Sequence, residues 1–273
     1  MIDRGQGTPF LLIPGIQGRW EWMAPAIDAF AARGRVLSFS LCDEPTSGYG
    51  WRVERGFENY VQQIEETLDR ANVDRAVLVG ASYGGLVASE FAARRSDRVQ
   101  ALVLASALPI GWQPDRRAAF YMRAPLALSP LFVMGAPLRL YPEVAAAYPE
   151  LAARWRFFAT QGGRVVRAFL SPTRTARRVR WAAAHRFADP SAITAPTMIV
   201  TGERGLDRVV PPEVTACCAH GLRDVRHEVL PRTGHIGIVT RPDAFADMVS
   251  TFADERRAGT SSKPSPAGIG VVA

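Results

Sequence analysis

Residues 76–93 read AVLVGASYGGLVASEFAA, and the character of this stretch changes twice along its length. Residues 76–79 are apolar, as in a buried strand, whereas residues 86–93 favour a helix. The pattern Gly-x-Ser-x-Gly lies between them and is centred on Ser82. A sharp strand-to-helix turn needs small residues beside the serine, because larger side chains would collide with neighbouring backbone. We therefore predict a turn that raises the Ser82 hydroxyl above the end of a strand; a glycine-rich turn with an idle serine is the alternative.

Six short β-rich runs, including this one, alternate with helical patterns along the chain. They are residues 10–13, 36–40, 76–80, 99–105, 197–201 and 225–230. Several are continuously apolar, as parallel strands covered on both faces should be. Strands that alternate with helices indicate right-handed crossovers within one sheet. The predicted fold class is therefore α/β, with a mostly parallel sheet of about six strands.

The alternation stops between about residues 108 and 189. Eight prolines and many large apolar side chains occupy this stretch. Because prolines break helices, we predict several short helices inserted across the end of the sheet; ordinary helices packed on a sheet face are the alternative. The core is then formed by 1–107 and 190–258, with the helical insertion at 108–189. Residues 259–273 are polar and without periodicity, which predicts a disordered tail.

The composition favours one globular domain and excludes several classes of protein. The 273 residues are 48% hydrophobic and 22% charged, which supplies enough apolar surface for a core. The net charge is +7, but no long basic tract, zinc-ligand spacing or aromatic RNA-binding motif accompanies it. We therefore expect no nucleic-acid partner. No apolar stretch approaches the roughly 20 residues that span a membrane.

The N-terminal residues and the cysteines indicate a cytoplasmic protein. Residues 1–5 run straight into a strand-like segment without the pattern of a signal peptide. The three cysteines are Cys42, Cys217 and Cys218. An odd number with two adjacent members cannot form a disulfide framework, so we expect a reducing compartment.

A serine becomes a good nucleophile only when a base accepts its proton, so the chain should also supply a histidine. His235 follows the last predicted strand within RTGHIG, where glycines on both sides leave the backbone free to aim the ring. His185 lies in the insertion, His220 in a helical stretch and His227 inside a strand. We therefore select His235 as the base; the alternative is a histidine that only packs or faces solvent.

An acid is needed to orient the histidine, and the segment after 197–201 offers two. Asp207 and Glu203 both lie in the sequence GERGLDRVVP. Asp207 lies further from the strand end and precedes the next helix, whereas Glu203 suits a turn or surface pairing. We therefore select Asp207, for which a plain turn aspartate is the alternative.

Four segments in this order resemble the α/β-hydrolase superfamily. Residues 10–18 look like its oxyanion loop, 80–84 like its nucleophile elbow, 202–212 like its acid loop, and 234–245 like its histidine loop and final helix. The resemblance implies an eight-stranded, mostly parallel sheet with a helical lid, which 108–189 matches. Two features depart from the family: Pro14 replaces its usual histidine, and its two leading strands have no room before Phe10.

The resemblance does not choose a substrate, but the three side chains predict a serine hydrolase that cleaves a carboxylic ester or thioester through an acyl-enzyme. Ser82 would be the nucleophile, His235 the base and Asp207 the acid that orients it. The backbone N–H groups of Tyr83 and Ile16 would bind the oxyanion, with Gln17 as the alternative to Ile16. No metal or organic cofactor is expected. A serine at the elbow, in place of aspartate, argues against haloalkane dehalogenases and epoxide hydrolases.

Other functions stay open on the same residues. The site could serve C–C bond hydrolysis, acyl transfer or lyase chemistry, or the chain could be a non-catalytic binding protein. The expected partner is a small acyl substrate with an apolar moiety, and the candidate pocket residues are Gln17, Trp20, Trp112 and Trp155; plain core is their alternative role.

The insertion also carries a loose cluster of basic residues. They are arginines 164, 167, 174, 177, 178, 180 and 186. We expect a solvated helix face; attraction of an anionic acyl carrier or a carboxylated ester is the alternative.

Overall fold

A computed structural model describes residues 1–261, except for the side chains of 117, 129–133 and 259–261. Its centre is a seven-stranded sheet in the order β1-β3-β2-β4-β5-β6-β7. Only the pair β1 and β3 is antiparallel. The strands are β1 Ile2–Arg4, β2 Pro9–Ile13, β3 Arg35–Ser38, β4 Ala76–Ala81, β5 Val99–Ala105, β6 Thr197–Thr201 and β7 Val225–Val229. The predicted α/β class and the mostly parallel sheet are therefore confirmed.

The sheet has one strand more than the six runs seen in the sequence. The additional strand, β1, has three residues, and its register places Ile2 opposite Ser38 and Arg4 opposite Val36. Its sequence IDR contains one apolar residue, so hydrophobic periodicity could not reveal it. Pairing with the edge of β3 supplies the backbone hydrogen bonds that stabilise this short strand.

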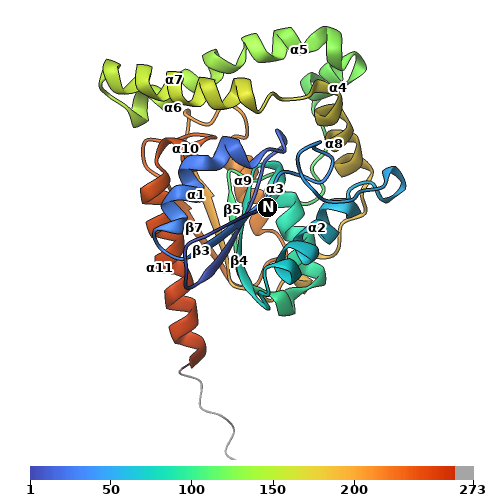
Figure 1. Cartoon of the computed structure of the whole chain (residues 1–273), viewed down its shortest axis with the longest axis vertical. Helices are drawn as coiled ribbons and strands as arrows, with labels where there is room; N and C mark the ends of the chain where they lie inside the picture. The colour runs from blue at the N-terminus through green and yellow to red at the C-terminus, as the bar shows by residue number, and fades with distance from the viewer. Residues whose placement is uncertain (262–273) are drawn as a thin grey trace, which may run out of the picture.

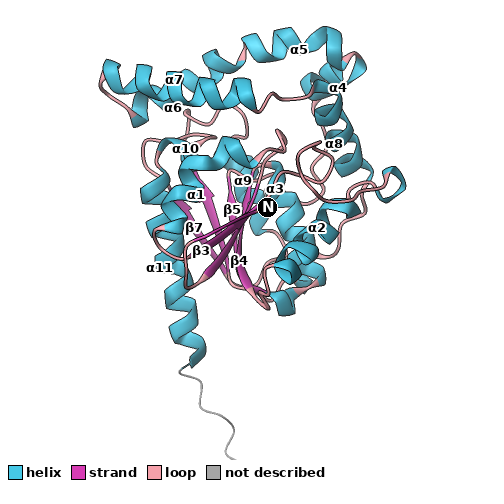
Figure 2. Ribbon diagram, in the orientation of Figure 1, coloured by secondary structure: helices cyan, strands magenta, loops and turns pink. Residues whose placement is uncertain are grey.

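Helices cover both faces of the sheet, as Figures 1 and 2 show. Alternate residues of β2 point to opposite faces: Phe10 packs with α1 and α11, whereas Leu11 packs with α2 and α3. These four helices are α1 Ala24–Ala31, α11 Pro242–Ser261, α2 Glu58–Arg70 and α3 Tyr83–Arg94. The apolar runs of the strands are therefore covered on both sides.

The insertion between β5 and β6 is helical, as predicted. It contains α4 Arg116–Arg123, α5 Pro125–Met134, α6 Ala136–Ala147, α7 Leu151–Arg167 and α8 Pro172–Ala184. Figure 1 shows α5, α6 and α7 lying across the end of the sheet. We call the segment formed by α4 to α8 the lid.

The remaining helical segments are short. They are α9 Pro212–Ala216, α10 Gly237–Thr240 and the 3-10 segments η1 Trp20–Met23, η2 Val53–Arg55, η3 Ser96–Arg98, η4 Pro190–Ala192 and η5 Cys217–Ala219. Within residues 1–261, no helix has both the length and the apolar character that a membrane crossing requires.

The last helix runs past the predicted start of the C-terminal tail. The predicted tail begins at residue 259, but α11 continues to Ser261. A helix that is already packed, here through Val249 and Phe252, propagates with little further cost, so it gains about one more turn. The rest of the predicted tail, 262–273, lies outside the described residues.

Candidate active site

Ser82 occupies a sharp turn between β4 and α3. Its backbone angles are φ 52° and ψ −117°, a region that residues with a side chain rarely adopt. A Cβ atom on Gly80 would lie 2.6 Å from the carbonyl oxygen of Gly84, and one on Gly84 would lie 2.4 Å from that of Ile13. Only glycine fits at either position. The predicted strand–turn–helix geometry around Ser82 is therefore present.

Asp207 and His235 form a hydrogen-bonded pair. The distance between His235 Nδ1 and Asp207 Oδ2 is 3.2 Å, and Asp207 is 5% exposed. The other carboxylate oxygen, Oδ1, accepts the N–H groups of Val209 and Val210 at 2.9 and 2.8 Å. Burial acts to raise the pKa of Asp207, but the hydrogen bond and charge of His235 and these two N–H groups hold that pKa below its ordinary value. Asp207 can therefore orient the ring while remaining ionised.

Two glycines allow the acid loop and the histidine loop to touch. A Cβ atom on Gly234 would lie 2.6 Å from the carbonyl oxygen of Leu206, and one on Gly202 would lie 2.5 Å from that of Thr233. Any larger residue at either position would push the two loops apart. The local sequence thus fixes the approach of His235 to Asp207.

All three predicted residues follow the carboxyl ends of strands. Ser82 comes after β4, Asp207 after β6 and His235 after β7, and these strands are parallel in one sheet. Ser106, which follows β5, donates its hydroxyl to the Gly234 carbonyl at 3.4 Å. Among the described residues, no hydrogen bond joins the Ser82 hydroxyl to the His235 ring. Such contacts are often long in enzymes without substrate and tighten on binding.

The segment after β2 lies directly beside Ser82. A Cβ atom on Gly15 would be 3.5 Å from the Cβ of Ser82. The Gly18 N–H donates to the Gly15 carbonyl at 2.9 Å, which closes a turn over residues 15–18. Within residues 1–261, the N–H groups of Ile16 and Tyr83 donate to no backbone carbonyl. Both donors are therefore available to an anion near Ser82.

The other acid and two of the other histidines have partners elsewhere. Glu203 accepts the Arg232 N–H at 2.8 Å, which is the turn role that its position predicted. His185 Nε2, directly after α8, lies 3.0 Å from a carboxylate oxygen of Glu90 in α3. His227 Nε2 lies 3.1 Å from the Thr201 hydroxyl, within the sheet.

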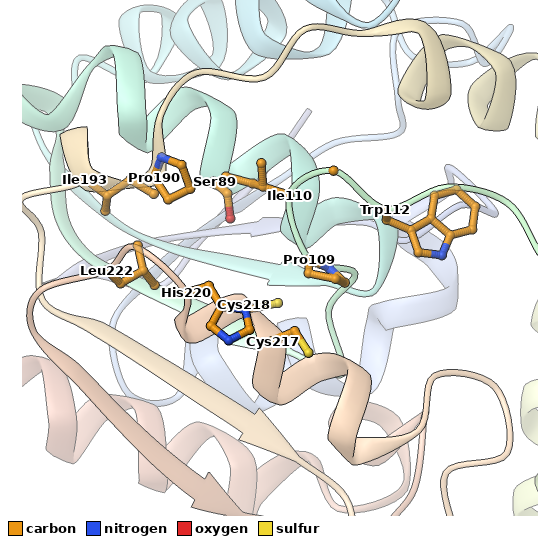
Figure 3. A pocket seen from close by; sticks show the side chains of 11 residues that line it. Ser89, Pro109, Ile110, Trp112, Pro190, Ile193, Cys217, Cys218, His220 and Leu222 are labelled. Atoms are coloured by element: carbon orange, nitrogen blue, oxygen red, sulfur yellow. The ribbon is translucent and has the colours of Figure 1, made fainter.

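The candidate pocket tryptophans lie in three different places. Trp112 packs on the α3 side of the sheet and lines a cavity of about 230 Å³, shown in Figure 3 with Cys217 and His220. Trp20 packs on the opposite side, with Phe10. Trp155 is 67% exposed on α7. None of the three predicted catalytic residues lines the Trp112 cavity. Gln17 alone of the four candidates lies beside the Ser82 turn, with Oε1 2.7 Å from the Cβ position of Gly15.

The expectation of a solvated arginine face on the lid is wrong for three residues. Arg178 is fully buried and lies 2.7 Å from Asp43 and 2.6 Å from Glu44. Arg174 pairs with Glu44 at 3.1 Å and Arg177 with Asp43 at 2.9 Å. Burial disfavours the charged form of Arg178, but the adjacent carboxylates outweigh it and raise the pKa of its guanidinium. We call these five side chains the ionic joint.

The ionic joint also reaches the segment beside Ser82. Arg178 Nη1 donates to the Ile16 carbonyl at 2.8 Å, and the Tyr83 hydroxyl donates to the Arg178 carbonyl at 3.1 Å. Sequence reasoning missed this role because Arg178 and its acidic partners are more than 130 positions apart. The acidic pair Asp43-Glu44 after an apolar run was the only available signal. No cluster of three or more His, Cys, Asp or Glu side chains suited to a metal occurs in the described part of the chain.

Comparison with known proteins gives the chain its family. The model of the alpha/beta hydrolase family matches residues 10–248. "Putative carbamate hydrolase RutD" of Azorhizobium caulinodans is 27% identical over 92% of this chain and 93% of its own length. The 2-hydroxy-6-oxo-2,4-heptadienoate hydrolase of Pseudomonas putida is 26% identical over 92% and 90%. A thermophilic esterase from Thermogutta terrifontis superposes with a TM-score of 0.70 at 20% identity, over 93% of this chain and 92% of its own. The chain belongs to the alpha/beta hydrolase family.

Proposed function

We propose that the protein is a serine hydrolase that cleaves a carboxylic ester or thioester through an acyl-enzyme, with Ser82 as nucleophile. The observation that carries this proposal is the hydrogen-bonded Asp207–His235 pair at the same sheet edge as the strained Ser82 turn. A hydroxyl, a carboxylate and an imidazole in this order along the chain match the chemistry of acyl transfer.

The proposed reaction has two halves. His235 Nε2 accepts the Ser82 proton while Oγ attacks the carbonyl carbon, and the same proton then passes to the leaving alcohol or thiol. Asp207 accepts the hydrogen bond from Nδ1, which fixes the tautomer and stabilises the imidazolium. In the second half, His235 deprotonates water, which attacks the acyl-enzyme. The C–O bond to Ser82 Oγ then breaks, Oγ takes the proton back from His235, and the acid is released.

The N–H groups of Ile16 and Tyr83 are the proposed oxyanion donors. The position of Gly15 beside Ser82 and the start of α3 at Tyr83 support this assignment. Preorganised donors of this kind contribute about 3 kcal/mol each to the stability of a tetrahedral intermediate. The Pro14 that replaces the family histidine has no N–H, but the proposed donor is Ile16, so the oxyanion site does not depend on it.

C–C bond or carbamate hydrolysis is the second candidate. The relatives named for these two reactions each align with 92% of this chain, which supports both reactions as candidates. Each reaction can use the same three side chains and the same oxyanion donors. Product analysis separates them, since an ester yields an alcohol, a carbamate yields ammonia or an amine, and a C–C substrate yields two carbon fragments.

We also propose that the substrate is a small molecule with an apolar moiety and that the protein acts in the cytoplasm. The aromatic and aliphatic residues of the lid support the first point, since the lid lies across the sheet edge that carries Ser82. The three cysteines, of which Cys42 and Cys218 are buried, are free thiols, which supports the second point.

Labelling with a fluorophosphonate probe, followed by peptide mapping, tests the proposal. The wild-type protein should be labelled at Ser82 and should hydrolyse members of a panel of aryl esters and acyl thioesters of graded length. Ser82→Ala should abolish both, with Ser89→Ala, a buried serine of α3, as the matched control. Labelling at another residue, or hydrolysis that survives Ser82→Ala, would contradict the proposal.

A further inference from the structure

A glutamate of the lid reaches the loop that carries His235. Glu143 lies in α6 and is fully buried. Its two carboxylate oxygens accept the Ile236 N–H at 3.0 and 3.1 Å, and the Thr240 hydroxyl lies 3.4 Å from Oε1. Ile236 is the residue directly after His235, so the lid holds the backbone of the histidine loop.

Burying the Glu143 carboxylate costs free energy, which its partners must offset. A buried charge is costly unless it is paired or hydrogen-bonded, and an apolar residue could fill the same volume at no such cost. The charged groups that face Glu143 are His235, which favours its ionised form, and Asp207, which opposes it. Burial raises the pKa of Glu143 above its ordinary value, and the Ile236 and Gly234 N–H groups and His235 offset only part of that rise. The carboxylate therefore lies within the electrostatic field of the Asp207–His235 pair.

We propose that Glu143 is a positioning residue for His235: it fixes the histidine loop against the lid and supplies a second negative charge that favours the imidazolium. This inference rests on the proposed function, because it assigns His235 the role of base. Asp207 orients the ring through its side chain, whereas Glu143 acts on the adjacent peptide. The two carboxylates thus hold the histidine from two different elements.

The contact also couples the lid to the base. The Tyr148 hydroxyl, at the end of α6, donates to the Thr240 carbonyl at 2.8 Å. A second lid residue therefore binds the segment that follows His235. If α6 moves outward, the Ile236 N–H loses its acceptor and the loop loses its anchor. His235 is therefore fully aligned only while α6 is packed against the histidine loop.

The rate of fluorophosphonate labelling of Ser82, measured against pH, tests this role without knowledge of the substrate. Glu143→Gln keeps an acceptor for the Ile236 N–H but removes the charge. In this variant we expect the acidic limb of the labelling rate against pH to move to lower pH, because the imidazolium loses a stabilising partner. The expected move is about one pH unit, the size of shift that one nearby charge causes. Glu143→Ala loses the anchor as well, and we expect a rate about a hundredfold lower, as for misplaced catalytic groups.

Two control variants separate positioning from simple destabilisation. Glu90→Gln neutralises an equally buried glutamate, which accepts hydrogen bonds from His185 and Ala188, just after α8, but not from the histidine loop. Thr240→Val removes a hydroxyl beside Glu143 and leaves the charge. Neither should move the acidic limb.

The outcomes distinguish this inference from the proposed function. Folded Glu143→Gln with a wild-type pH profile, or the same shift in Glu90→Gln, would overturn the positioning role while Ser82 labelling stands. If the wild-type protein is not labelled at Ser82 at all, the proposed function itself is wrong. If Glu143→Ala does not fold, the near-isosteric Gln variant still decides the question through its pH profile.

Discussion

Ser82 adopts a backbone conformation that costs free energy in any residue except glycine. Its φ of 52° with ψ of −117° is held by the packing of Gly80 and Gly84 against neighbouring backbone. Strained residues of this kind cost about 1–3 kcal/mol and persist where the surroundings enforce them. The strain places the hydroxyl at the sheet edge instead of within the α3 helix, where it would face other side chains.

Replacing Ser82 by glycine should therefore stabilise the protein while ending its labelling. We expect Ser82→Gly to raise the free energy of unfolding by about 1 kcal/mol, since relief of strain exceeds the added entropy of the unfolded glycine. Urea unfolding followed by circular dichroism measures this change. Ser82→Ala keeps the strained backbone and serves as the comparison; a glycine variant less stable than the alanine variant would refute the argument.

At the scale of elements, α8 is joined to the core by the ionic joint. Arg178 is the only fully buried arginine of the described residues, and it contacts Asp43, Glu44 and the Ile16 carbonyl together. A buried ion pair adds little net stability over an apolar substitute, but removing one partner leaves the others unpaired. The joint therefore specifies where α8 sits relative to the segment beside Ser82.

Arg178→Met should cost about 3–5 kcal/mol of unfolding free energy, because it leaves two buried carboxylates without their main partner. Arg174→Met, a partly exposed member of the same joint, should cost about 1 kcal/mol or less. Combining Arg178→Met with Asp43→Asn and Glu44→Gln should recover part of the loss. Equal costs for Arg174→Met and Arg178→Met in urea unfolding would show that burial does not govern the joint.

The elements also show which features a sequence can reveal. The parallel strands were predictable because burial on both faces leaves continuous apolar runs, and the Ser82 turn was predictable because its glycines are sterically required. The strand β1 was not, because main-chain pairing maintains it. Glu143 and Arg178 were not either, since each pairs with residues more than 90 positions away and local patterns carry no trace of such pairing.

At the scale of the whole molecule, the lid is attached unevenly. Glu143 anchors α6 to the histidine loop, and Arg178 anchors α8 beside Ile16. No residue of α7 is buried, whereas four residues of α8 are. A hydrogen bond from Trp22 to the Ala168 carbonyl, at 2.9 Å, holds the residue that ends α7. The lid is thus fixed where it meets the two loops beside Ser82 and loosely held between them.

Local opening should follow this pattern, because amide exchange is slowest where buried contacts must break first. In hydrogen–deuterium exchange with mass spectrometry, α8 and the second half of α6 should exchange more slowly than α7. Glu143→Ala should accelerate exchange in α6 and in 234–240 without changing α8, and Arg178→Met should accelerate α8 more than α6. Uniform exchange across the lid, or equal effects of the two variants, would mean that the lid opens as one unit instead of through two separate anchors.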